Sequence, residues 1–420
     1  MGVIAKIRSW VMQEIVLVVS VIAAALSCIF VPFDGQYVTY IDWHTLALLF
    51  SLMSVVAGLR FLGVFRLLGE WVVAHTKTKA MIAFSLVGLS FVCSMVITND
   101  VSLITFVPFA IVIMHQAKMD WYMGPVVALM TVAANLGSML LPMGNPQNLY
   151  LFQVSGFGFA SFVSLMAPYT AVSAVLLIAA LVMLFRRGMR NARDAHSVQN
   201  ANSIHNIHSE TNTENVSADY ARKSRITRHI PSKRKMGKAL VYGVLFLACL
   251  AAVLDVVNVF AVCVLVFAVV LVMDTKTLLR VDYGLLCTFV ALFVFVGNMG
   301  RIPVIHDGIA QLVGIAPVVA SALLSQIISN VPAALLLSGF TDQWQALIIG
   351  TNIGGLGTLI ASMASIISFK LITTEGLVSR SAYLRTFTLY NVVFLFILLV
   401  FNAGPVSYTH LRAHETVLDL

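Results

Sequence analysis

Long apolar runs follow one another along almost the whole chain, and they constrain its fold more than any other feature. A transmembrane helix needs roughly 20 mainly apolar residues to cross a bilayer. The chain of 420 residues is 60% hydrophobic and only 10% charged, whereas a soluble domain is about a quarter charged. A membrane β-barrel would show short segments of alternating polarity, which the sequence lacks. We therefore predict an all-α, polytopic membrane protein.

The apolar runs divide into full spans, hairpins and interrupted helices. We predict full spans over residues 11–31, 43–62, 160–185, 239–254, 257–273, 283–300 and 386–401. Two hairpins are predicted, 81–97 with 101–114 and 316–328 with 332–340, and two interrupted spans, 123–152 and 345–373. The fold class is thus two repeats, each with a re-entrant hairpin and a broken transmembrane helix, with about nine full spans and two hairpins in all.

The positions of lysine and arginine predict the orientation. With the N-terminus in the cytoplasm, all but Arg301 and Arg412 of the 26 lysines and arginines fall on the cytoplasmic side. This requires each hairpin to enter and leave on one side, the two from opposite faces, so the repeats are inverted. The same bias explains the net charge of +8 without a nucleic-acid partner. We expect a multi-pass protein of the cell inner (plasma) membrane with a cytoplasmic N-terminus.

The return legs of the hairpins look too short to cross. At 1.5 Å per residue, 101–114 spans about 21 Å and 332–340 about 14 Å, against a hydrocarbon core of about 30 Å. We therefore expect re-entrant hairpins; full crossings with an exposed polar turn are the alternative.

The predicted organisation has five parts. These are an N-terminal repeat (1–185), a disordered cytoplasmic linker rich in Asn and Ser (186–238), a connecting helix (239–256), a C-terminal repeat (257–403) and a polar tail (404–420). The tail resembles translated adaptor sequence found at the ends of unrelated reading frames, and we interpret it as non-native.

Polar motifs recur in the two halves. The hairpin tips read Thr98-Asn99-Asp100 and Ser329-Asn330-Val331, and glycine or proline interrupts the later helices at 144–146 and 354–357. Broken helices free backbone groups that lipid cannot satisfy, so they line a cavity or hold a ligand. Half-helix N-termini attract anions, and freed carbonyls with Asn, Ser or Thr oxygens suit sodium. Inverted repeats with interrupted helices are typical of secondary transporters.

Asp100 is the one carboxylate that we place at membrane depth. An ionised group there costs roughly 3 kcal/mol on insertion scales, so it should be paired, neutral or functional. We interpret it as a sodium ligand or a proton carrier; capping of the helix that follows is the alternative. Asn330 could likewise be a plain cap, and the glycines of 354–357 could serve close helix packing.

The paired tips and broken helices resemble those of the ion transporter superfamily, which includes citrate-transporter-like anion permeases, divalent anion:sodium symporters, arsenite permeases and sodium/proton antiporters. Symporter tips read Ser-Asn-Thr, and Asn-Asp at the first tip is more similar to the arsenite permease and antiporter branches. The resemblance implies a homodimer, an elevator-like motion and no cofactor beyond sodium or a proton as coupling ion. It also implies two ion sites and one substrate site. The ion-binding residues are Thr98, Asn99, Asp100, Gly144, Asn145 and Asn148 at one site and Ser329, Asn330, Thr351, Asn352, Gly354 and Thr358 at the other; the substrate-binding residues are Asn99, Asn330, Pro146 and Thr358.

The function predicted is an ion-coupled secondary transporter of a small anion, such as a di- or tricarboxylate or an inorganic oxyanion. A sodium/proton antiporter and an ion channel are the alternatives. An enzyme is not expected, because the apolar segments show neither a catalytic Ser/His/Asp set nor the ligand spacing of a transition-metal site.

Overall fold

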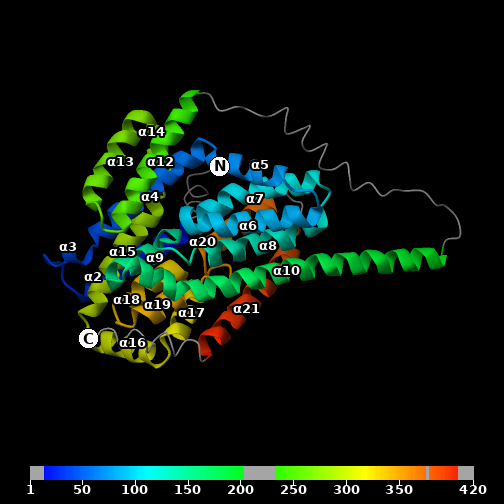
Figure 1. The fold of residues 1–420 in the computed structure, drawn as a ribbon. Helices are drawn as coiled ribbons and strands as arrows, with labels where there is room; N and C mark the ends of the chain where they lie inside the picture. The colour runs from blue at the N-terminus through cyan, green and yellow to red at the C-terminus, as the bar shows by residue number, and fades with distance from the viewer. Residues whose placement is uncertain (1–13, 203–232, 375–377, 405–420) are drawn as a thin grey trace, which may run out of the picture.

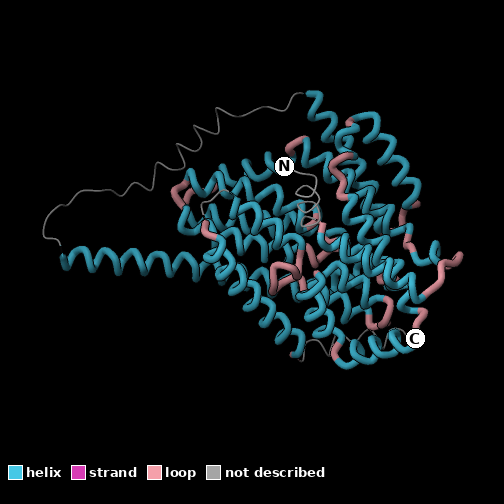
Figure 2. The backbone as a smooth tube through the Cα atoms, turned by 180° about the vertical axis from the view of Figure 1, so that it is seen from behind, coloured by secondary structure: helices cyan, strands magenta, loops and turns pink. Residues whose placement is uncertain are grey.

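The computed structural model describes residues 14–202, 233–374 and 378–404. Every regular element in these residues is a helix, as predicted (Figure 1). Seven of the described helices are long and apolar enough to cross a membrane, and a bent pair raises this to eight. Figure 2 shows loop backbone enclosed within the helical body as well as at its rim.

The helices follow the same order twice. The first series is α2 (Ile15–Phe30), α3 (Tyr37–Tyr40), α4 (Trp43–Phe61), α5 (Val64–Ala74), α6 (Lys79–Ile97), α7 (Asn99–Gln116), α8 (Asp120–Gly137), the 3-10 turn η1 (Pro142–Gly144), α9 (Pro146–Ser155) and α10 (Phe159–Asn202). After α12 (Lys233–Val253), the second series is α13 (Val259–Met273), α14 (Thr275–Leu278), α15 (Tyr283–Gly300), α16 (Pro303–Ile315), α17 (Pro317–Ile328), α18 (Asn330–Ser338), α19 (Trp344–Ile353), α20 (Met363–Thr374) and α21 (Arg380–Ala403). Matching helices even begin alike. Asp42 accepts a hydrogen bond from the Thr45 amide at 3.0 Å, and Asp282 accepts one from the Leu285 amide at 2.9 Å.

The packing of the helices repeats too, and it crosses between the series. Helix α2 packs on α15 and α13 on α4, while α7 packs on α20 and α18 on α9. Within each series, the first leg of the hairpin packs on the first part of the broken helix: α6 packs on α8, and α17 packs on α19. Helices of each series therefore pack directly against helices of the other.

Two glycines allow this close packing. A Cβ on Gly137 would lie 2.0 Å from the Phe91 carbonyl oxygen, and one on Gly354 would lie 2.8 Å from the Ala322 Cα. Small residues let membrane helices approach closely enough for van der Waals contact to hold them. These glycines therefore allow the ends of α8 and α19 to pack closely against α6 and α17 of the two hairpins.

Three features differ from the sequence prediction. The return leg α7 has 18 residues, about 27 Å, because Asn99, Asp100, His115 and Gln116 are helical too. It is one of the helices long and apolar enough to cross a membrane, so the prediction that this leg is too short was wrong. The re-entrant course of the hairpin stays a prediction. Helix α18 keeps the predicted short length of 9 residues.

Helix α10 continues to Asn202 and projects from the body (Figure 1), so the linker predicted to be disordered begins with helix. Residues 233–238 of that linker belong to α12, and 203–232 lie outside the described residues, as do 405–420 of the predicted non-native tail.

Two surface helices, α5 and α16, were not predicted. Helix α5 buries Phe65, Gly69 and Val73 and exposes Leu67 and Trp71, so its apolar residues do not form one long run. Each of the two helices directly precedes a hairpin, in the same place of its series.

Candidate functional site

The two hairpin tips share an unusual backbone conformation. Thr98 has φ 71° and ψ 149°, and Ser329 has φ 77° and ψ 154°. This region is almost restricted to glycine and costs other residues about 1–3 kcal/mol. In both tips the next residue is an asparagine whose Oδ1 accepts the following backbone amide, from Asp100 at 2.9 Å and from Val331 at 3.0 Å. The chain therefore builds the same strained turn twice.

The first tip is bound to parts of both series. Asn99 donates to Asn135 Oδ1 at 2.9 Å, and Ser362 Oγ donates to the same oxygen at 3.0 Å. Asn135 Nδ2 donates to the carbonyl of Gly355 at 3.2 Å. The start of α7, the end of α8 and the break between α19 and α20 thus meet at one buried point. We call Asn99, Asn135, Gly355 and Ser362 the first half-site.

The second tip meets the same break. The backbone amide of Asn330 donates to the Ala361 carbonyl at 2.9 Å, and Ser329 Oγ donates to the same carbonyl at 3.4 Å. A Cβ on Gly355 would lie 2.9 Å from Asn330 Nδ2, so that glycine leaves room for the tip. The starts of α7, α18 and α20 are therefore close together.

The first broken helix joins this centre through its own asparagines. Asn352 at the end of α19 donates to Asn148 Oδ1 at 2.6 Å. Asn145 donates to Ser138 Oγ at 2.6 Å, and Asn148 donates to the Ser138 carbonyl at 3.3 Å. We call Asn330, Asn352, Asn145 and Asn148 the second half-site.

Several buried polar atoms at this centre have no hydrogen-bond partner among the described residues. They are Asp100 Oδ1, Asn145 Oδ1, Asn352 Oδ1, Ser365 Oγ and both polar atoms of the Gln147 amide. Amide, hydroxyl and carboxylate oxygens are the ligands that a hard cation takes. No group of three or more His, Cys, Asp or Glu in the described chain could hold a metal. The unpartnered oxygens are of the kind that sodium takes.

The remaining predicted residues lie at different places. Thr358 is exposed and is bound to α17: its amide donates to Gln326 Oε1 at 2.9 Å, and its hydroxyl donates to the Gln326 carbonyl at 3.0 Å. Gln326 also donates to the Gly354 carbonyl at 2.9 Å. Thr351 bonds back within its own helix, to Leu347 at 2.8 Å. Gly144 lies against Ser138, and its Cβ would be 2.1 Å from that carbonyl.

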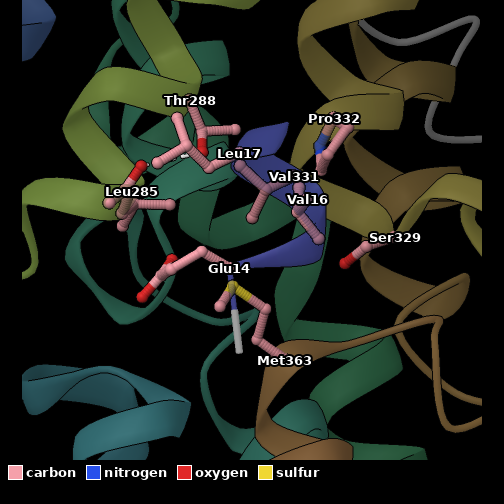
Figure 3. A pocket seen from close by; sticks show the side chains of 10 residues that line it. Glu14, Val16, Leu17, Leu285, Thr288, Ser329, Val331, Pro332 and Met363 are labelled. Carbon is pink, nitrogen blue, oxygen red and sulfur yellow. Dashed lines mark hydrogen bonds between the residues drawn. The ribbon is translucent and has the colours of Figure 1, made fainter. Parts of the chain in front are cut away.

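A recess opens beside the second tip (Figure 3). Its empty space is about 370 Å³ including the mouth, and it is lined by Glu14, Thr288, Ser329 and Met363 among others. In the close-up, the Ser329 hydroxyl and the Glu14 side chain lie on opposite sides of Val16 and Val331. Helices α2 and α15 therefore face the site through this recess.

Comparison with known proteins identifies the family. A family model described as citrate transporter matches residues 4–342. The chain belongs to the citrate transporter family. The match includes both hairpin tips and the first broken helix, and it ends before α19.

Two relatives of this citrate transporter family member are similar over most of its length. An uncharacterized transporter of Methanocaldococcus jannaschii is 29% identical over 332 residues, 79% of this chain and 81% of the relative. The inner membrane protein YbiR of Escherichia coli is 26% identical over 346 residues, 81% of this chain and 83% of the relative. The family and these names indicate a multi-pass membrane transporter rather than an enzyme.

Several residues at the centre of this citrate transporter family member were not among the predicted site residues. They include Asn135, Gln147, Gln326, Ser362 and Ser365, and Glu14 lines the recess beside them. Asn135 could have been found, because it precedes the first break as Asn352 precedes the second. The structure also rearranges the predicted groups. Asn99 contacts Asn135 and Ser362, whereas Asn148 of the first predicted ion site contacts Asn352 of the second.

Proposed function

We propose that this chain is an ion-coupled secondary transporter of a small anion, such as a di- or tricarboxylate or an inorganic oxyanion. The observation that carries the proposal is the first half-site, where the tip of one series and the broken helix of the other share hydrogen bonds at Asn135. Transporters built from two repeats bind their solute where the broken helices of the repeats meet, and this junction is such a place.

Helix ends support an anion as the solute. Helices α7, α18 and α20 begin within this hydrogen-bonded cluster, and α9 begins beside it through Asn148 and Asn352. Unpaired amides and the helix dipole make such N-termini favourable for negative charge. The family description, citrate transporter, names an anion of the same kind.

Unpartnered oxygens support a coupling cation. Asn145 Oδ1 and Asn352 Oδ1 are buried, and they belong to residues that are 2% exposed. Sodium could take these oxygens, whereas a proton could be carried by Asp100. Either ion would offset the charge of an anion bound at the helix N-termini.

Motion and assembly follow from the resemblance. In this proposal the hairpins and broken helices, α6–α9 and α17–α20, move as an elevator against α2–α4 and α12–α15. The protein is a homodimer in the inner membrane with its N-terminus in the cytoplasm. The inner-membrane name of the Escherichia coli relative is consistent with that location.

A sodium/proton antiporter is the second candidate, and one observation favours it. Asp100 Oδ1 is buried without a partner among the described residues, as a carboxylate that exchanges ions would be. In that case Asp100 alone would carry the exchanged ions, and no anion would be needed.

Uptake into proteoliposomes tests the proposal. The purified protein is reconstituted and offered labelled anions with a sodium gradient, a pH gradient, both or neither. We expect at least one anion to accumulate only when a gradient is present. Flux of every anion without dependence on either gradient would contradict coupling. Proton flux driven by sodium in the absence of any anion would indicate the antiporter.

A further inference from the structure

Gln147 is the least satisfied polar side chain near the candidate site. Its residue is 0% exposed, and neither Oε1 nor Nε2 has a hydrogen-bond partner among the described residues. It is the second residue of α9, between Pro146 and Asn148 of the predicted site. A buried polar group without a partner is costly, and proteins rarely keep one unless something pairs with it.

The position of Gln147 on α9 shows which elements it faces. Residues three and four apart share a helix face, so Gln147 lies one turn before Tyr150 on the same face. The Tyr150 hydroxyl is 2.8 Å from Ser338 Oγ on α18, and its ring centroid is 5.5 Å from that of Phe293 on α15. Gln147 therefore lies on the face of α9 that is directed toward α18 and α15, at the end of α9 that is next to the break.

The second repeat shows that the fold does not need this amide. Asn135 and Asn352 precede the two breaks, and Pro146 and Met363 begin the two helices that follow, 11 residues later in each case. Gln147 then corresponds to Ala364, which is 0% exposed as well. One repeat fills this position with a methyl group and the other with an unpaired amide, so the amide serves something other than packing.

We propose that Gln147 binds the transported solute and selects one that carries a hydroxyl or a protonated oxygen beside an anionic oxygen. This inference depends on the proposed function. A primary amide presents one acceptor and two donors in a plane. An anion whose oxygens are all ionised can accept from Nε2 but leaves Oε1 unpaired. A solute with an added hydroxyl satisfies both atoms.

The start of α9 and two asparagine oxygens offer further ligand atoms beside Gln147. Asn145 Oδ1 and Asn352 Oδ1 are also buried without partners among the described residues, and Asn352 contacts the first turn of α9 through Asn148. The start of α9 supplies amides for the anionic oxygen. Gln147 adds the acceptor that a helix N-terminus lacks.

Pairs of anions that differ by a hydroxyl test the inference. The probes are malate with succinate, citrate with tricarballylate, and hydrogenphosphate with sulfate. Binding of each to the purified full-length protein is measured by titration, for wild type, Gln147→Leu and Gln153→Leu. Gln153 is the other glutamine of α9, at the far end of the helix, and is the matched control.

We expect the hydroxylated member of at least one pair to bind wild type about tenfold tighter, as one added hydrogen bond allows. Gln147→Leu should bring that ratio close to one, and Gln153→Leu should keep it. If anions bind but no pair shows a hydroxyl preference, or if the preference survives in Gln147→Leu, the inference alone is overturned. If no anion of the three pairs binds wild type, both the inference and the proposed function fail.

Thermal unfolding without solute gives a second readout. Gln147→Leu should unfold at the wild-type temperature or higher, because it removes an unpaired buried amide. A lower unfolding temperature would mean that the amide already has a structural partner, and it would overturn the inference too.

Discussion

The two half-sites are built on the same backbone turn but differ in how their side chains are satisfied. At the first, the amide of Asn99, the whole amide of Asn135 and the hydroxyl of Ser362 bond to one another or to Gly355. At the second, the oxygens of Asn145 and Asn352 have no partner among the described residues. The first half-site is therefore closed by the protein itself, whereas the second leaves groups for a ligand.

The surroundings of the two half-sites differ as well. The hairpin of the first has legs of 19 and 18 residues and carries Asp100 in its tip. The hairpin of the second has legs of 12 and 9 residues, has Val331 in place of the carboxylate and borders the recess. The first half therefore combines a carboxylate with long hairpin legs, and the second combines shorter legs with the neighbouring recess.

The largest expected effect is on coupling. Asp100→Asn removes the charge of the first tip and should reduce gradient-driven uptake to the level of empty liposomes, because no other tip residue can carry a proton or neutralise a cation. Asp120→Asn is the control, since Asp120 is exposed and pairs with His115 at 2.7 Å. Coupled uptake that survives in Asp100→Asn would remove Asp100 from the mechanism.

The next effect compares the stability of the half-sites. Asn135→Ala breaks three hydrogen bonds, two of which join the two series, and leaves the Gly355 carbonyl without this donor. It should lower the free energy of unfolding by about 3 kcal/mol. Asn352→Ala loses bonds to Asn148 and to Ile348 of its own helix, and should cost about 1–2 kcal/mol. Chemical unfolding in detergent measures both losses of unfolding free energy. A larger loss for Asn352→Ala than for Asn135→Ala would mean that the second half-site, and not the first, is the one closed by the protein itself.

The tips themselves should respond alike. Thr98→Gly and Ser329→Gly relieve a backbone conformation that favours glycine, and each should raise the free energy of unfolding by about 1 kcal/mol. Thr105→Gly, in the middle of α7, should instead lower it by about 1 kcal/mol. If one tip variant stabilises the protein and the other does not, the two turns are not equivalent.

The smallest effect concerns a bond between the two series that has no counterpart at the matching position. Tyr150 on α9 is bonded to Ser338 on α18, whereas the matching position of α20 is Ile367. Tyr150→Phe should cost about 0.5–1 kcal/mol of unfolding free energy. Tyr390→Phe is the control, with no expected change; equal losses in the two variants would show that the bond contributes nothing.

Much of the fold could be predicted from the sequence because its signals are local. Apolar length predicted the long helices, and polar residues within apolar runs predicted the tips and breaks. Helix α7 begins at Asn99, two residues before its predicted start, and α9 begins at Pro146, within the predicted interruption. The resemblance to citrate-transporter-like permeases is confirmed by the family match. The roles assigned to the site residues stay predictions.

The rest depends on contacts that a single sequence does not encode locally. Asn135 and Gly355 are 220 residues apart, and Asn148 and Asn352 are 204 apart, so no spacing rule could pair them. The surface helices α5 and α16 are amphipathic or short, and a search for long apolar runs misses them. Helix α10 continues past its apolar stretch because helix formation propagates through residues such as Arg and Ala.

Accessibility of the two tips tests the central claim most directly. Thr98→Cys and Ser329→Cys are made separately in a variant lacking Cys28, Cys93, Cys249, Cys263 and Cys287. Each is labelled in proteoliposomes with a membrane-impermeant thiol reagent, with and without the transported anion and coupling ion. We predict that the same ligand pair slows labelling at both positions, because both tips close on one site. Constant labelling of the two cysteines from opposite sides, unaffected by ligand, would contradict the account.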